Sequence, residues 1–506
     1  MACSASYGVC TTVHLTVGMR KATQLAAATA VVLALGIPLA ALAGSRGGES
    51  SATPTATPSF TRDVAPVIQQ KCAGCHQLGG IAPAPFETAR QISSRSALIA
   101  ATVQSGLMPP WPPGPRSPSY VGEQDRRLSA AERATLLDWA RAGGKIDGPA
   151  RKPLPKKSVQ VAPGESVLTL RMPSAYKPRA AKGVTDDYRC FLLDPKRAGD
   201  SFVTSARIDP GAAKVVHHVI LFRVSRAQVA DAKRLDSGAA GLGWNCFGGT
   251  GLPSGDGSGS IQDSLNDANW VAAWAPGWGG NRLPQGTGVP LPAGSQIVMQ
   301  VHYNLLNGRT LDRSRAVLTV APAAAKLTPL QTMLLPAPVE IPCAQGERGR
   351  LCNRNEALFD LTGKYGSQAA FVPAGLLILC RGSAANPRAG GVSSCDRRLT
   401  QPTTIHVAAG HMHLLGASIR VELNPGTPGA QVLLDIPRWD FHWQNAYTLA
   451  REVRAGPGDV VRVTCRHDVH KRMHGGHGIP KTPRYILWGE GTTDEMCLGI
   501  LQVTRG

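Results

Sequence analysis

Histidines that sit close together in β-rich stretches are the first candidates for chemistry in this sequence. G-H-M-H-L-L-G places His411 and His413 one residue apart. Because side chains alternate along a strand, these two imidazoles face the same way and Met412 faces the other. Two imidazoles on one face can bind one metal ion, although a packed pair of core histidines would give the same spacing.

Two further sites add histidines to apolar runs. His217 and His218 are adjacent in V-V-H-H-V-I-L-F-R-V, and they can bind one metal together only if a twist or a bulge turns them to the same side. Q-V-H-Y-N adds His302, with Gln300 and Asn304 on its own face. Buried imidazoles without a metal would leave polar groups that are costly to satisfy. A mixed set of histidine and methionine favours copper, because the thioether is a soft ligand.

A methionine near the end of the sequence can complete one of these sites. Met496 lies beside Cys497 in G-T-T-D-E-M-C. It is a candidate third ligand for the metal held by His411 and His413, and its spacing alone leaves an ordinary core methionine open.

A C-x-x-C-H motif predicts a second kind of redox centre. Cys72 and Cys75 can bond the two vinyl groups of a c-type haem, and His76 then lies under the iron as an axial ligand. Met108 in S-G-L-M-P-P-W-P-P-G is the expected sixth ligand, and Trp111 of the same loop could pack against the ring. Such ligation closes the iron to oxygen and suits an electron carrier. The alternatives are a zinc half-site and a redox disulfide, but the sequence has no second C-x-x-C and no thioredoxin-like pattern.

The elements that must hold these residues are mostly short strands. With 56 Gly and 39 Pro among 506 residues the chain is rich in turns, and no alternation of strands and helices is visible. We predict a mainly β fold with sandwich or jelly-roll domains at residues 164–323 and 324–506. Strands are predicted at residues 215–224, 296–305, 404–416, 417–423 and 459–465.

The part before these domains is predicted to be helical. A small all-α unit of the cytochrome c type is expected at residues 57–147, and its last helix begins with a capping box between Ser129 and Glu132. Residues 148–163 are rich in Pro and Lys, which is typical of a semi-rigid linker.

The first 43 residues are predicted to be a signal peptide with its start at Met19. A positive n-region and an apolar h-region precede Ala41-Leu42-Ala43, which fits a cleavage site. We expect a periplasmic or secreted protein with no stable membrane span after cleavage, an uncleaved anchor being the alternative. Export permits disulfides among the remaining cysteines.

The positive charge of the chain is not concentrated in one stretch. Lys and Arg number 54 and Asp and Glu number 34, which gives a net charge of +20. Because the basic residues are spread out and no aromatic-basic motif accompanies them, we predict no nucleic-acid partner. The charge suits solubility and attraction to anionic surfaces or acidic partners.

Several stretches, taken in order, resemble the copper type II, ascorbate-dependent monooxygenases, the group of peptidylglycine α-hydroxylating and dopamine β-monooxygenases. The four main ones are H-H-V (217–219), V-H-Y (301–303), H-M-H-L-L-G (411–416) and D-E-M-C (494–497). Further similar stretches are Y-R-C-F (188–191), W-A-P-G (274–277), W-Q-N-A-Y (443–447) and G-P-G-D (456–459). The resemblance covers roughly residues 180–506.

The resemblance implies two jelly-roll domains with one copper ion in each, facing each other across a solvent-filled cleft. The ligands of the electron-transferring copper would be His217, His218 and His302. The ligands of the catalytic copper, which meets O2, would be His411, His413 and Met496. Gln300 matches a family glutamine next to the first site. The expected cofactors are thus two copper ions and one covalent haem c.

The chain departs from the peptidylglycine enzymes where those anchor a peptide carboxylate. It has Ala409 in place of an Arg before the H-x-H pair, and Leu498 and Ile500 in place of an Asn and a Tyr after the methionine. These departures imply a small or apolar organic substrate. We expect an exported monooxygenase that inserts one atom of O2 into a C–H bond. In this hypothesis the cytochrome replaces ascorbate and passes electrons from a periplasmic donor to the first copper.

Two other functions fit parts of the pattern. The same ligands could serve a non-catalytic periplasmic copper-binding electron carrier. A haem–copper nitrite reductase would need a cysteine thiolate for a blue-copper centre, whereas the cysteines outside the haem motif are better explained as disulfides.

The resemblance also implies disulfides Cys465–Cys497 and Cys190–Cys246. The four remaining cysteines would pair among themselves, with pairing between sequence neighbours as one option. They are Cys343, Cys352, Cys380 and Cys395. Sequence alone does not decide the pairing, because eight cysteines can combine in many ways.

The other histidines carry weaker signals. H-D-V-H-K-R-M-H-G-G-H (467–477) is predicted to be a solvated loop, with a copper-collecting or substrate-facing loop as the alternative. His406 and His442 are predicted to be structural.

Overall fold

The computed structural model describes residues 57–506 with short gaps. The gaps are residues 78–81, 83, 123–124, 156–159, 181–182, 253–260, 277–280, 474–478 and 480. The predicted signal peptide, residues 1–43, lies outside the described residues. Among the helices that the structure describes, none is both long and apolar enough to cross a membrane.

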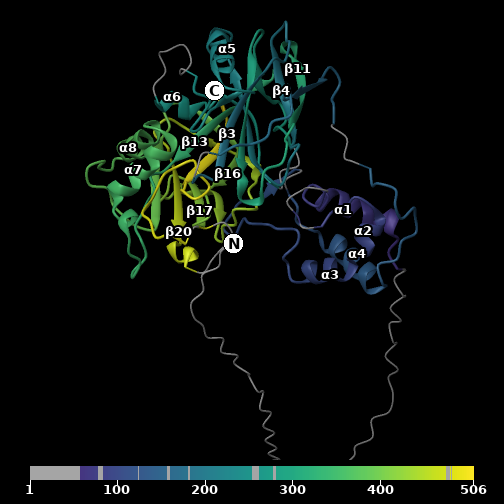
Figure 1. Ribbon diagram of the computed structural model, residues 1–506. Coiled ribbons are helices and arrows are strands. Elements are labelled where there is room, and N and C mark those ends of the chain that lie inside the picture. The colour runs from purple at the N-terminus through teal and green to yellow at the C-terminus, as the bar shows by residue number, and fades with distance from the viewer. Residues whose placement is uncertain are drawn as a thin grey trace, which may run out of the picture. The chain divides into compact units, whose positions relative to one another are not determined.

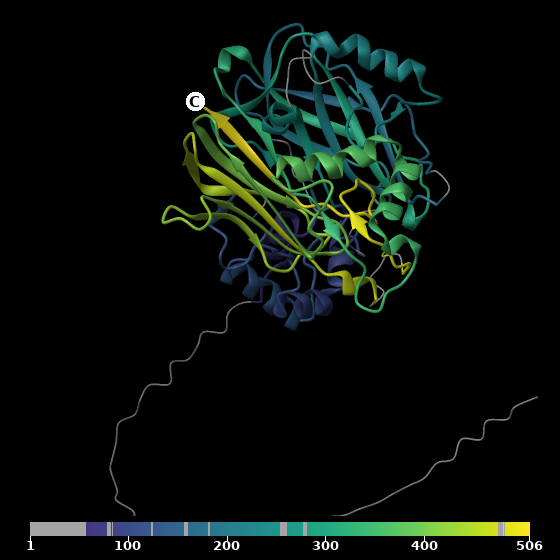
Figure 2. The same cartoon turned by 90° about the vertical axis from the view of Figure 1, so that its left-hand side faces the viewer.

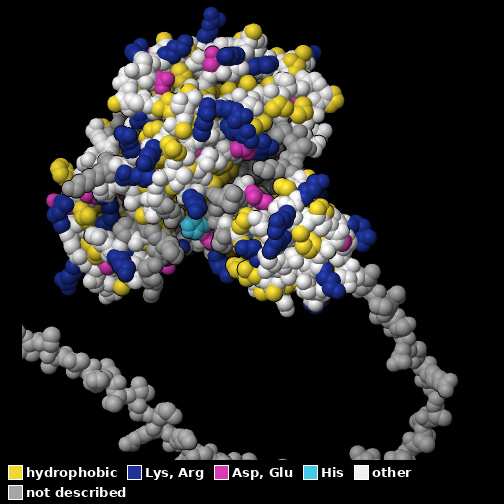
Figure 3. Space-filling model, turned by 45° about the vertical axis from the view of Figure 1, so that its right-hand side comes forward, with side chains coloured by type: hydrophobic (Ala, Val, Ile, Leu, Met, Phe, Trp, Pro, Cys, Tyr) yellow, Lys and Arg dark blue, Asp and Glu magenta, His cyan; other side chains and the backbone are white. Residues whose placement is uncertain are grey.

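The described chain is mainly β, as the sequence predicts (Figure 1). Two pairs of facing sheets form two sandwiches, and helices α1 to α4 are grouped together apart from them. Lys and Arg side chains are scattered over the face seen in Figure 3, in keeping with a charge that is spread along the sequence.

The N-terminal described part is a small helical unit. Its helices are η1 (Phe60–Val64), α1 (Ala65–Lys71), α2 (Ala89–Ser93), α3 (Ser96–Gln104) and α4 (Ala130–Arg141). The predicted capping box is confirmed, because Ser129 Oγ accepts the Glu132 N–H and the Glu132 carboxylate accepts the Ser129 N–H. Trp139 of α4 is fully buried against Phe60, with ring centroids 5.8 Å apart.

The stretch predicted as a linker begins by packing on this helical unit. The Leu154 N–H donates to the Glu87 carbonyl at 2.7 Å, and the Arg90 N–H donates to the Ala150 carbonyl at 2.9 Å. The first half of residues 148–163 is therefore held by backbone hydrogen bonds. Sequence reasoning missed this because Pro- and Lys-rich composition gives no hint of tertiary partners.

The first sandwich consists of two sheets whose inner faces share one core. One sheet has the strand order β6-β3-β10-β5-β7, and the other has the order β12-β9-β4-β11-β2, with β8 beside β4. The strands are β2 (Ser166–Arg171), β3 (Asp186–Leu193), β4 (Ser201–Asp209), β5 (Val216–Val224), β6 (Trp244–Asn245), β7 (Trp270–Trp274), β8 (Asn281–Arg282), β9 (Thr287–Leu291), β10 (Gln296–Asn304), β11 (Arg315–Pro322) and β12 (Thr328–Pro329). Phe191, Leu221 and Leu318 from the two sheets are fully buried together. Two predicted strands correspond to β5 and β10, which lie side by side in the same sheet.

The second sandwich follows and has the same layered plan. Its sheets have the orders β1-β19-β16-β22-β13 and β15-β20-β17-β18, and β14 pairs with β21. The strands are β1 (Tyr120–Val121), β13 (Gln331–Pro336), β14 (Glu340–Ile341), β15 (Val392–Arg398), β16 (Thr403–His411), β17 (Gly416–Leu423), β18 (Gln431–Ile436), β19 (Ala446–Ala455), β20 (Val460–His467), β21 (Ile486–Leu487) and β22 (Leu498–Arg505). Ile405, Val421 and Val463 are buried in its core.

The predicted strand 404–416 is in fact interrupted by a turn. β16 ends at His411, and β17 begins at Gly416. A Cβ at Gly416 would lie 2.6 Å from the Trp439 ring and 2.9 Å from the Met412 Cβ, so only glycine fits where the chain reverses. The reversal moves β17 into the opposite sheet.

Helices between the strands were not predicted. They are α5 (Val229–Gly238), α6 (Ile261–Asn266), α7 (Arg354–Tyr365) and α8 (Gln368–Leu379), with short turns of helix at η2 (Arg226–Gln228), η3 (Leu305–Asn307), η4 (Ala323–Ala325), η5 (Arg350–Cys352) and η6 (Val469–Arg472). Asn353 caps α7 by accepting two backbone N–H groups. α8 is apolar on nearly every side and contains Pro373, so its sequence lacks a helical period. In Figure 2 these two green helices lie where the teal and the yellow-green strands meet.

Four disulfides brace the two sandwiches. They are Cys190–Cys246, Cys343–Cys352, Cys380–Cys395 and Cys465–Cys497. Both pairs implied by the resemblance are confirmed, and the other four cysteines pair with their sequence neighbours. Disulfides of this number suit a protein of an oxidising, extracytoplasmic compartment.

Candidate metal centre

Two adjacent strands of the first sandwich bring three histidines together. His217 and His218 lie on β5, and His302 lies on β10. The register between these strands shifts at His302, so that the pairing skips His217, which forms a bulge. The bulge that an adjacent histidine pair requires is therefore confirmed. One ligand atom from each of the three rings lies within 4.8 Å of the others.

Hydrogen bonds decide which nitrogen of each ring can face a metal. His302 Nε2 lies 2.8 Å from Asp186 Oδ1, so its N–H donates to the carboxylate and Nδ1 keeps its lone pair. That Nδ1 lies 3.3 Å from the Nδ1 of His217. The buried Nδ1 of His218 has no hydrogen-bond partner among the described residues. A metal ion would satisfy this unpartnered buried nitrogen and would bind the other two rings at the same place.

The protonation state of these rings also suits a metal. Burial lowers the pKa of His217 and the pKa of His218 well below the usual value, and the neighbouring His302 lowers both further. The rings are therefore neutral at neutral pH, which is the form that binds a metal. Three imidazoles fit copper, zinc or iron.

Asp186→Asn is expected to weaken copper binding at this cluster by about 10–100-fold, because an amide orients His302 less firmly and makes it less basic than a carboxylate does. Competition with a chelator measures the affinity. Asp187→Asn is the matched control, because Asp187 is the next residue on β3 and bonds Tyr176 and Arg179 instead. Equal affinities in the two variants would contradict the prediction.

The second sandwich holds two histidines at the end of β16. His411 is the last residue of β16, and His413 lies in the turn that follows, with ring centroids 5.1 Å apart. Met412, between them, is fully buried in the sandwich core. The residue between the two imidazoles thus points away from them, as strand alternation predicts.

In this pair too, each ring is oriented by a hydrogen bond at one of its nitrogens, Nδ1. His411 Nδ1 lies 2.6 Å from Gln444 Oε1, and because that oxygen can only accept, Nδ1 carries the proton and Nε2 keeps its lone pair. His413 Nδ1 lies 3.3 Å from the Asp494 carbonyl oxygen, which selects the same tautomer. Burial lowers the pKa of His411 to about 4, and it lowers the pKa of His413 well below the usual value. Both rings offer a neutral Nε2.

The loop that carries Met496 is tied to this histidine turn by Glu495. The Glu495 carboxylate accepts backbone N–H groups from His413, from Leu415 at 2.9 Å and from Met496 at 2.9 Å. The Cys465–Cys497 disulfide braces the same loop. Met496 is buried and lines the same cavity as His411. The thioether therefore belongs to the surroundings of the second histidine pair.

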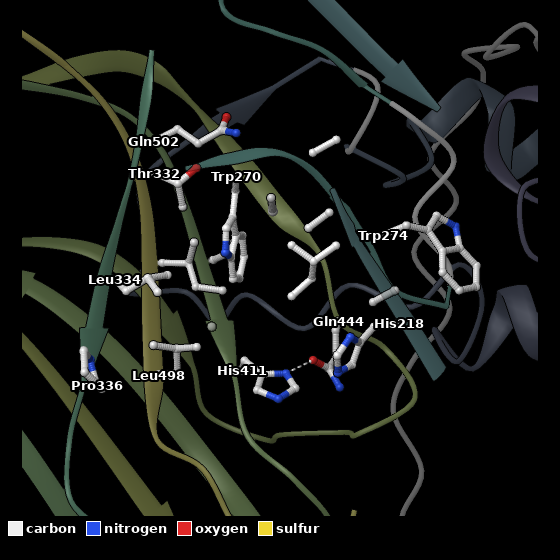
Figure 4. A pocket seen from close by; sticks show the side chains of 18 of the residues that line it. His218, Trp270, Trp274, Thr332, Leu334, Pro336, His411, Gln444, Leu498 and Gln502 are labelled. Atoms are coloured by element: carbon white, nitrogen blue, oxygen red, sulfur yellow. Dashed lines mark hydrogen bonds between the residues drawn. The ribbon is translucent and has the colours of Figure 1, made fainter. Parts of the chain in front are cut away.

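One cavity of about 680 Å³ joins the two clusters (Figure 4). His217, His218 and His411 line it, and the ring centroids of His218 and His411 are 6.2 Å apart. Phe441 stacks on His217 at 4.5 Å and meets the edge of His413 at 6.0 Å. The two clusters are therefore closer together than the solvent-filled cleft that the resemblance implies.

The C-x-x-C-H motif follows α1 in the helical unit. Cys72 and Cys75 are free thiols, whereas the other described cysteines form disulfides. His76 Nδ1 lies 2.8 Å from the Ala84 carbonyl oxygen, which leaves Nε2 available, and its ring stacks on Phe86 at 4.0 Å. Two free thiols beside a histidine held in one tautomer fit a covalently attached haem.

The loop after α3 carries Met108 and then runs onto the second sandwich. Met108 is half-buried, and its N–H donates to the Thr102 carbonyl at 3.1 Å. Trp111, which could also pack against a haem ring, packs on Tyr120 and Tyr447, with centroid distances of 6.2 and 5.5 Å. These partners lie far away in the sequence, so a local motif could not indicate them.

The remaining histidines divide into buried and exposed ones. His467 was predicted to lie in a solvated loop, but it is buried at the end of β20 near Ser393, at 3.4 Å. His470 is exposed, and His474 and His477 lie outside the described residues. His406 Nε2 lies 2.9 Å from Thr504 Oγ1, and His442 is exposed.

Three residues that orient the histidines were not found from the sequence. Asp186, Gln444 and Glu495 each touch a candidate ligand only after the strands are assembled. Gln444 and Glu495 lie inside stretches quoted for the resemblance, but neither stretch indicates a role for them. Gln300, next to the first cluster by resemblance, lines the cavity and donates to the Cys246 carbonyl at 3.1 Å.

Sequence comparison relates the second sandwich to a known family. Residues 391–502 match the copper type II ascorbate-dependent monooxygenase, C-terminal domain. The matched monooxygenase domain contains His411, His413 and Met496, and it supports a copper monooxygenase in general. The first sandwich and the helical unit lie outside the matched residues.

Other comparisons add little. No curated protein is significantly similar in sequence to the chain. A xanthan lyase from Paenibacillus is 10% identical with a TM-score of 0.15, and the aligned region covers 72% of this chain but only 29% of that one. The VP2 subviral particle of infectious bursal disease virus is 8% identical with a TM-score of 0.15, over 68% of this chain and 72% of that one. TM-scores this low support no conclusion about fold or function.

Proposed function

We propose that the chain is an exported copper monooxygenase that inserts one atom of O2 into a C–H bond of an apolar substrate. Electrons reach it through a c-type haem held by Cys72, Cys75, His76 and Met108. The observation that carries the proposal is the single cavity lined by His217, His218, His411 and Met496, because it brings ligands of both sandwiches to one space.

The donor sets fit copper. Three imidazoles gather in the first cluster, and two imidazoles with a buried thioether nearby form the second. Copper bound at the two clusters would store one electron at each. Oxygen insertion consumes those two electrons and two protons per O2, placing one oxygen atom in the product and the other in water.

The protein's own residues prepare the site. Asp186 and Gln444 hold His302 and His411 in the tautomers that leave the other ring nitrogen with a lone pair. Burial keeps His217 and His413 neutral, so protons do not compete with a metal for these rings at neutral pH. The apolar walls exclude water from the reacting C–H bond.

The cavity lining favours an apolar substrate. Ala409, Leu498 and Ile500, which replace three polar residues of the peptidylglycine enzymes, all line it. Leu498 also lies close to Leu334 and His411 in Figure 4. Among the described lining residues the only cation is Arg282, and it pairs with Glu165 at 2.7 Å. A substrate carboxylate would therefore find no free cation there.

Ile500→Glu is expected to weaken the binding of an apolar ligand by at least about tenfold, because it places a carboxyl group in an apolar wall. Titration with the apolar dye Nile red measures the binding. Leu311→Glu is the control, because Leu311 is 60% exposed, away from the cavity. Unchanged binding in Ile500→Glu would argue that substrate lies elsewhere.

The reaction itself is tested with isotopically labelled O2 and the copper-loaded protein carrying its haem. We expect label in a hydroxylated product from an apolar substrate and none from a glycine-extended peptide. Consumption of O2 without labelled product from any substrate in a broad apolar screen would count against the monooxygenase.

A further inference from the structure

Residues 114–121, which we call the strap, fix the helical unit to the second sandwich. The Gly114 N–H donates to the Asp435 carbonyl at 2.8 Å, and the Tyr120 hydroxyl donates to the Leu433 carbonyl at 2.9 Å. β1, within the strap, pairs with β19 as an added edge strand. Arg116 also forms an ion pair with Asp435 at 3.1 Å. The helical unit, which carries the C-x-x-C-H motif, is therefore joined by hydrogen bonds and an ion pair to the sandwich that carries His411.

Next to this strap, Arg126 connects the thiol site with the sandwich. Arg126 Nη1 lies 3.3 Å from the Cys75 sulfur. The same arginine lines a cavity of about 10 Å³ together with Trp111, Gln444 and Tyr447. A space of that size holds at most one water molecule, so the packing across it is nearly continuous.

The far wall of this small cavity is bonded directly to a candidate copper ligand. Gln444 accepts the Nδ1–H of His411 at 2.6 Å, and it also lines the large cavity beside that ring (Figure 4). Trp111, three residues after Met108, packs on Tyr447 in the same wall. The haem is expected to be attached through Cys75 and through the Met108 loop. Cys75 contacts Arg126, and the Met108 loop carries Trp111. Both Arg126 and Trp111 line the small cavity beside Gln444 and Tyr447.

We infer that electrons from the haem enter the copper pair at the His411 site, through Arg126, Trp111 and Gln444. This inference rests on the proposed function and replaces the expectation that the first copper receives them. In each step one electron leaves the haem iron, which goes from Fe(II) to Fe(III), and one copper goes from Cu(II) to Cu(I). No bond is made or broken. Continuous packed and hydrogen-bonded contacts couple two redox centres better than a gap does.

The transfer can be watched without turnover. In the full chain carrying haem and copper, both oxidised, a short pulse of reductant reduces the haem. Its reoxidation is then followed by absorbance, and the loss of Cu(II) is followed by electron paramagnetic resonance. Arg126→Met is expected to slow reoxidation by about an order of magnitude. Arg133→Met is the matched control, because Arg133 binds the Gln104 carbonyl at 2.8 Å within the helical unit. The haem potential, measured in both variants, separates slower coupling from a changed driving force.

Removal of one copper at a time decides the point of entry. His302→Ala, which lacks a ligand of the first cluster, is expected to keep the fast reoxidation, and His413→Ala is expected to lose it. The opposite pattern, or a rate in Arg126→Met equal to that in Arg133→Met at equal potential, would overturn the inference. Haem and copper contents are measured beforehand. A protein without covalent haem or without copper would overturn the proposed function, and this inference with it.

Discussion

Replacing Met496 with isoleucine is expected to abolish product formation while the haem still cycles between its oxidised and reduced forms. Isoleucine fills a similar volume, so the buried loop stays packed, but it has no sulfur to bind copper. Product yield from an apolar substrate and the haem spectrum under reductant are the two measurements. A non-catalytic electron carrier would show no product before or after the change.

Met412→Ile is the matched control for this experiment. It makes the same chemical change in a methionine that lies between His411 and His413 but is buried in the sandwich core on the other side. We expect a loss of stability of less than about 1.5 kcal/mol and retained product formation. If both variants kept their activity, Met496 would be an ordinary core methionine.

The mature protein is expected to hold two copper ions and one covalent haem per chain, and His302→Ala is expected to hold one copper fewer. His302 is fully buried and its Nδ1 faces His217, so alanine removes one of the three imidazoles that converge there. Elemental analysis after removal of loosely bound metal gives the copper count, and the haem spectrum gives the haem count.

His442→Ala serves as the control for the copper count, because His442 is exposed and was predicted to be structural. It should leave both counts unchanged. Absence of tightly bound copper from the parent protein would mean that the histidine clusters are structural, and the enzyme assignment would be abandoned.

The parts of the fold with a local signal could be predicted from the sequence. β5 and β10 are continuous apolar runs, and α4 begins with a capping box, so each was located within one or two residues. The bulge at His217 followed from requiring two adjacent rings to share a side. α7 and α8 were missed, because they interrupt a β-rich region and α8 has no polar face.

The candidate ligands could be named from the sequence, but their supports could not. A histidine in an apolar strand can be recognised from the local sequence. Its hydrogen-bond partner cannot, because Asp186 contacts His302 only across two paired strands and Gln444 contacts His411 across another pair. The contact of Trp111 with Tyr447 depends on an edge strand contributed by a distant segment. Such long-range pairings leave no mark in the local pattern.

The cysteines of this protein place opposite redox requirements on its maturation. Eight of them are oxidised to form the four disulfides, while under the proposed function Cys72 and Cys75 would have to stay as thiols until haem is attached. Burial raises the pKa of Cys72 to about 12, so in the folded chain this thiol remains protonated and exchanges slowly with disulfides. Unwanted oxidation of this thiol is thus a risk mainly in the unfolded chain. If Cys72 and Cys75 hold a haem as proposed, its attachment would have to outpace their oxidation before folding. A host that makes the haem-loaded protein would then need a reductant for this motif as well as an oxidant for the other cysteines.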